Sequence, residues 1–324
     1  METRQPPPLD PEVRGACQVV RNPDGWVDIV MSQSWLGSFS LCPESARLDM
    51  VDPELTRFES DASFVGVAVH DVLDAIAKMW QQDPEQYEVK IRQAAGTGFS
   101  TEVVAMIEER VNPESLSQVM QMKATWMRNG AFNTALAIQD ATKWALDGIN
   151  ELGTLIHGMT PDQVLFEQSG TVEFLRGDGF SLWLHGTADI LIPDRRMACD
   201  WKTGSPKRKW ELERGAVQHL VYKAIWPWIR DFKWFYLDAK KAADVEVVVR
   251  MTNNDIDRLQ LLVEPIVQLI LNDPPEVVSA WPRTFDSWKC SEKWCKQHRE
   301  GKCIGATRVV FPEYAEHQLM ITED

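Results

Sequence analysis

The chain has 324 residues, of which 44% are hydrophobic, so it can bury a core and is not a globally disordered protein. Its formal net charge of -14 excludes a protein that coats nucleic acid through a generally basic surface, so any contact with DNA must be local. The chain has no apolar run long enough to cross a membrane and begins with prolines and acids, so we expect a cytoplasmic protein without membrane contact.

The first half of the chain is predicted to be helical. Residues 1–25 lack apolar periodicity and are expected to form a mobile lead-in. Apolar residues recur at helical spacing over 35–50 and 63–80, and two or three more helices are expected within 97–153.

After His157 the apolar residues alternate as in β-strands. The pattern predicts strands at 163–168, 171–176, 180–193, 196–202, 232–238 and 244–250. It also predicts helices at 211–229 and 254–272. Together these elements indicate an α/β protein with a central mixed sheet flanked by helices.

Residues 181–202 have the pattern of a β-hairpin with Asp194 and Arg195 as its loop. This pairing sets Asp189 opposite Asp200, and alternation places Lys202 on the same face as both acids. The other face would carry only apolar or small residues: Leu182, Leu184, Gly186, Ala188, Ile190, Ile192, Met197, Cys199 and Trp201.

The two facing carboxylates predict a cation site. Acids directly opposite each other in an antiparallel pair have Cβ atoms about 5 Å apart and repel. Mg²⁺ or Mn²⁺ suits such oxygen ligands and leaves positions for water and a phosphate oxygen. Lys202 would hold the attacking water and share the charge that develops on the phosphate. The alternative is that Asp189 and Asp200 are solvated acids on an exposed sheet face.

These residues resemble a known family. Gly186-Thr-Ala-Asp189 followed by Asp200-Trp-Lys202 is similar to the G-x-x-D and D/E-x-K motifs of the PD-(D/E)xK nucleases. Gly66 to His70 is similar to the G-x-x-x-H helix of their RecB-like branch, which includes CRISPR-associated exonucleases, and Gln218 to Tyr222 matches its Q-x-x-x-Y helix. The motifs keep the family's order along the chain.

The resemblance implies roles for further residues. His70 would join Asp189 and Asp200 as a metal ligand, and Gln218 and Tyr222 would contact the DNA backbone or shape the site. A glutamate often precedes the G-x-x-D strand in this family. We assign that position to Glu173, with Glu167 as the competitor.

The late cysteines suggest a second metal site. Cys290, Cys295 and Cys303 crowd into fourteen residues, which in a cytoplasmic chain indicates a metal. Several RecB-like nucleases hold a [4Fe-4S] cluster with one early and three late cysteines, and Cys42 fits the early position. The spacing of the trio is wider than usual, so a structural Zn²⁺ site formed by the trio and His298 remains the alternative.

The resemblance implies a metal-dependent DNA exonuclease of bacterial or phage origin, acting in recombination, repair or phage DNA processing. Local basic clusters flank the motifs, and Lys207, Arg208 and Lys209 are the candidate phosphate contacts. The rivals are a non-catalytic DNA-binding or scaffold subunit and a nuclease of a CRISPR adaptation complex. Recombination or CRISPR proteins are thus candidate partners, and the oligomeric state stays open.

In this interpretation the chain has three parts. The nuclease domain covers 26–287, with its helical part at about 82–157 and its catalytic sheet at about 160–250. The cysteine-cluster segment and tail cover 288–324.

Overall fold

The computed structural model describes residues 5–8, 17–51, 61–87, 98–111, 127–128, 131–203, 206–207, 209, 212–213, 216–237, 246–278, 281–282 and 295. Its helices are α1 (Gln33–Leu41), α2 (Pro43–Val51), α3 (Asp61–Gln82), α5 (Gly98–Arg110), α7 (Thr134–Ile156), α9 (Gln218–Ile225) and α10 (Asn254–Asn272). Its strands are β1 (Cys17–Arg21), β2 (Val27–Ser32), β3 (Met127–Arg128), β4 (Ala131–Phe132), β5 (Leu165–Gly177), β6 (Phe180–Ile192), β7 (Met197–Lys202), β8 (Asp231–Tyr236) and β9 (Glu246–Arg250). Within these ranges, no helix has the length and apolar character needed to span a membrane.

Seven strands of the described chain form one mixed sheet in the order β1-β2-β6-β7-β8-β9, with β5 paired to β6. β5 runs antiparallel along almost all of β6, so it occupies one edge of that strand. β2 and β7 share the other edge, where β2 pairs with residues 180–185 and β7 with residues 190–192. Among the strands that the structure describes, none pairs with residues 186–189 of β6 on this edge. We call this gap the fork.

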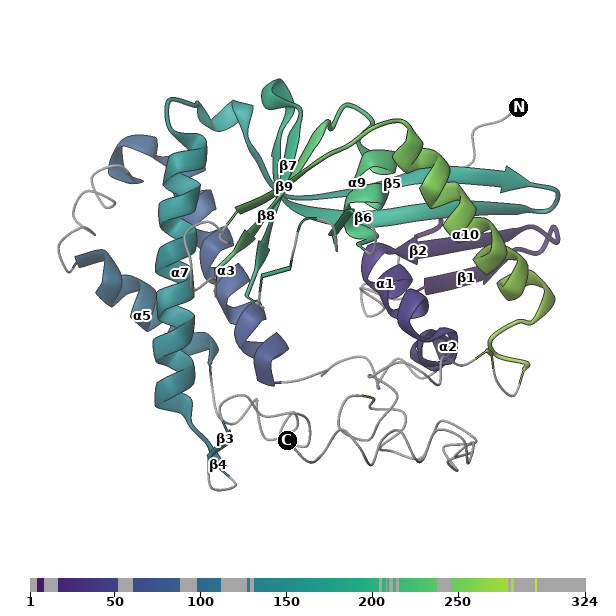
Figure 1. The fold of residues 1–324 in the computed structure, drawn as a ribbon, viewed down its shortest axis with the longest axis horizontal. Coiled ribbons are helices and arrows are strands. Elements are labelled where there is room, and N and C mark those ends of the chain that lie inside the picture. Colours follow the sequence, from purple (N-terminus) through teal and green to yellow (C-terminus); the bar gives the residue numbers. More distant parts are fainter. Residues whose placement is uncertain are drawn as a thin grey trace, which may run out of the picture.

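Helices cover both faces of the sheet (Figure 1). α3, α5 and α7 share one apolar cluster with Ile190, Cys199 and Trp201 of the sheet. On the other side, α9 and α10 pack with Leu182 and Leu184, together with α1 and α2. Apolar positions therefore occur on both faces, and the predicted class of an α/β protein with helices flanking a mixed sheet is confirmed.

Local sequence explains where several helices begin. The side chain of Ser32 accepts a hydrogen bond from the backbone of Trp35 at 3.1 Å, so α1 starts directly after β2. Cys42 is extended before Pro43, as expected for a residue that precedes proline, and this separates α1 from α2. The side chain of Asn133 caps α7 in the same way as Ser32 caps α1.

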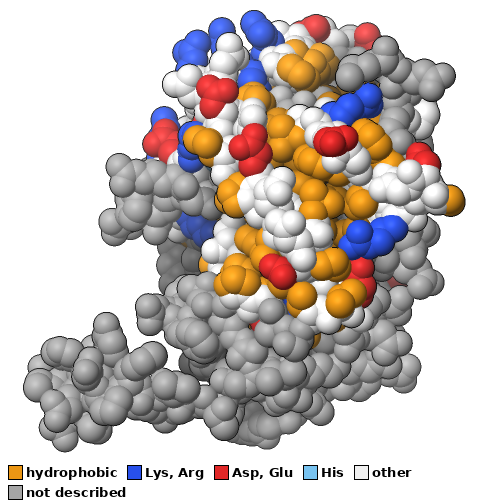
Figure 2. All heavy atoms as spheres, turned by 90° about the vertical axis from the view of Figure 1, so that its right-hand side faces the viewer, with side chains coloured by type: hydrophobic (Ala, Val, Ile, Leu, Met, Phe, Trp, Pro, Cys, Tyr) orange, Lys and Arg blue, Asp and Glu red, His pale blue; other side chains and the backbone are white. Residues whose placement is uncertain are grey.

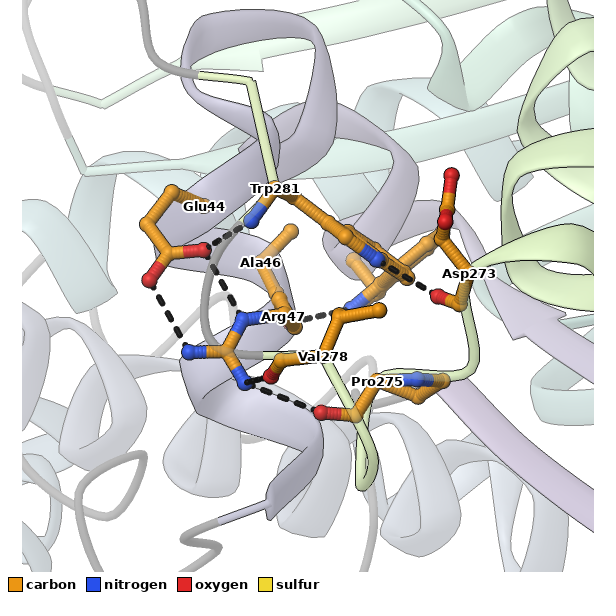
Figure 3. Close-up of polar contacts among 8 residues, drawn as sticks. Glu44, Ala46, Arg47, Asp273, Pro275, Val278 and Trp281 are labelled. Atoms are coloured by element: carbon orange, nitrogen blue, oxygen red, sulfur yellow. Dashed lines mark hydrogen bonds and ion pairs between the residues drawn. The ribbon is translucent and has the colours of Figure 1, made fainter.

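A buried ion pair ties α2 to the residues that follow α10 (Figure 3). Glu44 and Arg47 are bonded through two contacts of 2.8 and 2.9 Å, and both side chains are almost fully buried. Glu44 also accepts the backbone N–H of Trp281 at 2.6 Å, and Arg47 donates to the carbonyl of Pro275 at 2.9 Å. This clamp (Glu44, Arg47 and Trp281) joins segments whose contacting residues lie 228 and 237 positions apart in sequence.

The element predictions hold best for strongly periodic segments. The helices predicted at 63–80 and 254–272 are confirmed as α3 and α10. The helix predicted at 35–50 is two helices, and in the described part of 211–229 the regular helix includes α9, of eight residues, together with Leu212 and Glu213. The expected lead-in was wrong in part, because β1 at Cys17–Arg21 belongs to the central sheet.

Candidate active site

The predicted register of the β6–β7 hairpin is confirmed. Ile190 pairs with Cys199 and Ile192 with Met197, as that register requires. The turn is longer than expected, because Pro193–Arg195 form a 3-10 turn that ends in a left-handed residue, Arg196. The ladder stops at Ile190 and Cys199, so Asp189 and Asp200 lie directly beyond its last pair, at the mouth of the fork.

Asp189 occupies the position where the two strands separate. Its Oδ2 accepts a hydrogen bond of 2.7 Å from the backbone N–H of Trp201, and this side-chain bond stands where the ladder has ended. Nδ1 of His70, on α3, lies 3.6 Å from the same oxygen. Burial raises the pKa of Asp189 well above its usual value, and the negative charge of Asp200 adds to the effect. Burial lowers the pKa of His70.

Asp200 is held from two sides. Its residue is 3% exposed, its Oδ1 accepts a hydrogen bond of 2.5 Å from Nε2 of Gln218, and its Oδ2 forms an ion pair with the ammonium of Lys202. Asp200 Oδ2 is buried and accepts no hydrogen bond from the described residues, so its contact with Lys202 is an ion pair. Adjacent strand positions on one face explain why the aspartate and the lysine meet.

α9 fills the fork with its Gln218 and Tyr222 side chains, which lie one helical turn apart. The hydroxyl of Tyr222 donates to the carbonyl of Thr187, a fork residue, and accepts from Gln33 Nε2 at 3.1 Å. Burial raises the pKa of Tyr222, and the two aspartates contribute to the rise. Oε1 of Gln218 accepts the indole N–H of Trp234 at 3.1 Å.

Glu167, and not Glu173, lies beside this group. Its neighbours Phe166 and Gln168 pair with Ile190 and Ala188, which places Glu167 across from Asp189. Burial raises the pKa of Glu167 to about 7, and the charges of Asp189 and Asp74 act in the same direction. Asp74, Glu167 and Asp189 line one small cavity with apolar neighbours.

The assignment of Glu173 is therefore corrected. Glu173 pairs with Trp183, six positions from Asp189 on β6, which is a separation of about 20 Å along a strand. Its carboxylate is bonded to Arg176 at 2.6 Å and to Ser181 at 2.7 Å. These contacts stabilise the far end of the β5–β6 hairpin.

The prediction of one unbroken apolar face on the hairpin was also wrong. Leu182 and Leu184 pack on the α10 side, whereas Ile190 packs on the α3 side although its position has the same parity. The alternation reverses near Glu167, whose φ of 46° lies in the left-handed region and interrupts the pleat. Asp189 lies opposite this irregularity, so it points into the gap and not onto a flat face.

The remaining predicted residues lie in different places. Lys207 and Lys209 are exposed, Lys209 lies 3.8 Å from Glu213, and Arg208 lies outside the described residues. Cys42 ends α1 and is half-buried, as is Cys295. Cys290, Cys303 and His298 lie outside the described residues.

The donor chemistry at the fork fits a hard divalent cation. The carboxylates of Asp200, which is buried, and Asp189, whose side chain is 12% exposed, lie at the mouth of the fork. Burial and then the charge of Asp200 raise the pKa of Asp189, and Asp200 Oδ2 accepts no hydrogen bond from the described residues. In the described part of the chain, however, no three His, Cys, Asp or Glu side chains are already arranged around a common metal position. The side chains of His70, Asp189 and Asp200 would therefore need to move to hold a cation together.

Three residues of the site were missed because they lie outside the motifs. Gln33 of α1 donates a hydrogen bond to Tyr222, and Trp234 of β8 donates one to Gln218. Asp74 lies one turn after His70 on α3. The spacing of His70 and Asp74 was the available signal for the last of them. In the comparisons with known proteins, no family model matches the chain, and no curated protein matches it.

Proposed function

We propose that the chain is a metal-dependent DNA exonuclease of the RecB-like branch of the PD-(D/E)xK nucleases, with the mixed sheet as its core. One observation carries the proposal: the fork gathers Asp189, Asp200 and Lys202 with His70 from α3 and Gln218 from α9. These residues come from four elements, and each belongs to a motif that the sequence shares with that family. Such convergence is not expected of scattered surface acids.

Each of these residues would have a separate role in phosphodiester hydrolysis. Asp189, Asp200 and His70 would hold Mg²⁺ or Mn²⁺, which supplies Lewis acidity and lowers the pKa of a bound water. Lys202, whose side chain is 36% exposed, can reach a water or a phosphate oxygen from beside Asp200. Its ammonium would neutralise charge that develops on the phosphate. Gln218 keeps Asp200 in place, and Glu167 adds a further acid across from Asp189.

DNA would be held by local positive charge, since the chain as a whole is acidic. Lys207 and Lys209 are exposed a few residues after Lys202, so they are suited to phosphate contacts next to the site. Binding through these residues should weaken with added salt and depend little on sequence.

The cysteines are proposed to form a second, structural metal site. The clamp supports a site that joins Cys42 to the segment after α10. Glu44, two residues after Cys42, donates its backbone N–H to the carbonyl of Pro282. A [4Fe-4S] cluster would use Cys42, Cys290, Cys295 and Cys303, whereas Zn²⁺ would use His298 in place of Cys42. Metal analysis of anaerobically purified protein and of Cys42→Ala and His298→Ala variants separates the two.

A second candidate function is a non-catalytic DNA-binding subunit. It is favoured by the finding that the described residues hold no ready-made metal group. The deciding experiment is digestion of end-labelled single-stranded and double-stranded DNA with Mg²⁺, with Mn²⁺ or with EDTA. The proposed function predicts shortening from DNA ends with either cation and none with EDTA, whereas the second candidate predicts binding without shortening in all three.

A further inference from the structure

The side-chain amide of Gln218 makes three polar contacts. Its Nε2 donates to Oδ1 of Asp200 at 2.5 Å and lies 3.4 Å from the hydroxyl of Tyr222. Its Oε1 accepts from the indole Nε1 of Trp234 at 3.1 Å. An amide can exchange its oxygen and nitrogen by a half turn, so its neighbours determine which end faces Asp200.

Two neighbours determine the same orientation. The indole N–H of Trp234 can only donate, so the amide atom that faces it must be the oxygen. The hydroxyl of Tyr222 uses its single proton on the carbonyl of Thr187, so towards Gln218 it can only accept. If the amide were flipped, its oxygen would face the carboxylate of Asp200, and its NH₂ group would face the indole N–H of Trp234. Both contacts would be repulsive.

The packing of Trp234 fixes the position of its indole N–H. It is 1% exposed and pairs with Asp200 in the parallel β7–β8 ladder. Its ring lies 4.4 Å from that of Phe232 and 5.6 Å from that of His219, measured between ring centroids. A large side chain packed in this way cannot move away from Gln218 without disturbing the core.

We infer that Trp234 is a positioning residue for the hydrolysis. Its indole N–H holds Gln218 with Nε2 on Oδ1 of Asp200, which leaves Oδ2 of Asp200 for Lys202 and the reaction site. The inference rests on the proposed function, and it deepens that function by adding a residue that lies in none of the family-like motifs.

Trp234→Phe keeps an aromatic ring and removes the N–H. We expect kcat for DNA cleavage to fall about tenfold with little change in KM, because the lost hydrogen bond holds Gln218, which orients the proposed metal-binding carboxylate of Asp200. In a Gln218→Ala background the same substitution should change kcat by less than about twofold, because the residue through which Trp234 acts is absent.

Trp183→Phe is the matched control. Trp183 is 4% exposed, and its indole N–H donates to a buried carboxylate, that of Asp28, at 3.0 Å, away from the fork. This variant should lose stability and retain the wild-type kcat. The inference is overturned if Trp183→Phe lowers kcat as much as Trp234→Phe, or if the effects of Trp234→Phe and Gln218→Ala on kcat simply multiply.

Urea unfolding, which needs no enzymatic activity, is used to compare four proteins. They are the wild type, Trp234→Phe, Gln218→Ala and the variant with both substitutions. The hydrogen bond predicts that the two substitutions are non-additive in unfolding free energy, and additive values would overturn it. A wild-type protein that does not cleave DNA would refute the proposed function alone, since the unfolding cycle still decides whether Trp234 holds Gln218.

Discussion

The carboxylate of Asp189 accepts a hydrogen bond of 2.7 Å from the backbone N–H of Trp201, the residue after Asp200. The bond keeps the two acids together at the point where β6 and β7 stop pairing. Asparagine offers a similar acceptor without the charge. Asp189→Asn should therefore keep the bond, relieve the repulsion with Asp200, and raise the melting temperature in EDTA by about 2–4 °C.

Under the proposed function, Mn²⁺ should raise the melting temperature of the wild-type protein, and the same variant should lose this rise, because a proposed metal ligand is removed. Thermal unfolding with EDTA and with Mn²⁺ measures both effects. Asp178→Asn, in the exposed turn between β5 and β6, serves as the control and should behave as wild type. A lower melting temperature in EDTA, or an unchanged response to Mn²⁺, would speak against the role of Asp189.

Glu167 and Glu173 provide a matched pair on one strand. Glu167→Gln removes an acid next to Asp189 and should reduce the cleavage rate at least tenfold. Glu173→Gln weakens the contacts with Arg176 and Ser181 at the far end of the hairpin and should leave the rate unchanged. The rates are compared under matched Mg²⁺ concentrations. A loss only in Glu173→Gln would restore the assignment made from sequence, and equal rates for the two variants would contradict the role of Glu167.

The sequence predicts the site well where the apolar pattern agrees with the strand pairing in the structure. The apolar alternation around Asp194 and Arg195 predicts the register, and the structure has that register even though the turn is longer. The helical spacing of the α3 residues likewise predicts that His70 lies on a helix. Both signals are local, so they do not depend on the rest of the fold.

Other features depend on tertiary contacts that a single sequence does not reveal. The left-handed residue at Glu167 reverses the apolar alternation of its neighbour strand, and glutamate gives no signal for such a conformation. β1 looks like a lead-in because it is short and follows prolines, and its pairing with β2 makes it part of the sheet. Gln33 and Trp234 are ordinary residues until the fold brings them to α9.

His219 should make the stability of the protein depend on pH in the acid range. The side chain is fully buried, packs against Trp234 and Phe232, and forms no hydrogen bond with the described residues at either ring nitrogen. Burial lowers its pKa to about 4, although the charge of Asp255 opposes this, while that of Arg258 adds to it. The unfolded chain then binds more protons than the folded chain between about pH 4 and 6.5, so stability falls as the pH falls through this window.

At pH 5 this residue should cost about 2 kcal/mol of unfolding free energy relative to pH 7.5. His219→Phe should remove that part of the pH dependence, as measured by urea unfolding at both pH values. His157→Gln, at an exposed position after α7, is the control. A His219→Phe protein with the full wild-type loss at pH 5 would assign the loss to other groups.

The clamp makes the N-terminal helices depend on the chain beyond α10 (Figure 3). Arg47→Met leaves the buried carboxylate of Glu44 without its positively charged partner and should cost about 3–5 kcal/mol of unfolding free energy. Arg21→Met breaks the pair with Glu276, whose side chains are 44% and 51% exposed, and should cost less than about 1 kcal/mol. Urea unfolding compares the two, and similar costs would mean that burial of the clamp adds little.

The space-filling view also shows hydrophobic side chains on the face beside α10 (Figure 2). Leu261 and Val277, at 72% and 77% exposure, are the most exposed large apolar residues of the described chain. Neither contributes a contact to the fork, so substitutions there should not alter cleavage in the assay below.

The central claim is tested most directly by end-labelled DNA digested with Mg²⁺ by wild-type protein and by Asp200→Ala, with Leu261→Ala as the control. Asp200 is 3% exposed and lies between Gln218 and Lys202, so its removal takes away a proposed metal ligand and the partner of both residues. The account predicts that wild type and Leu261→Ala shorten the DNA, whereas Asp200→Ala binds it without cleaving it. Cleavage by Asp200→Ala at the wild-type rate, or no cleavage by the wild type with Mg²⁺ or Mn²⁺, would contradict the account.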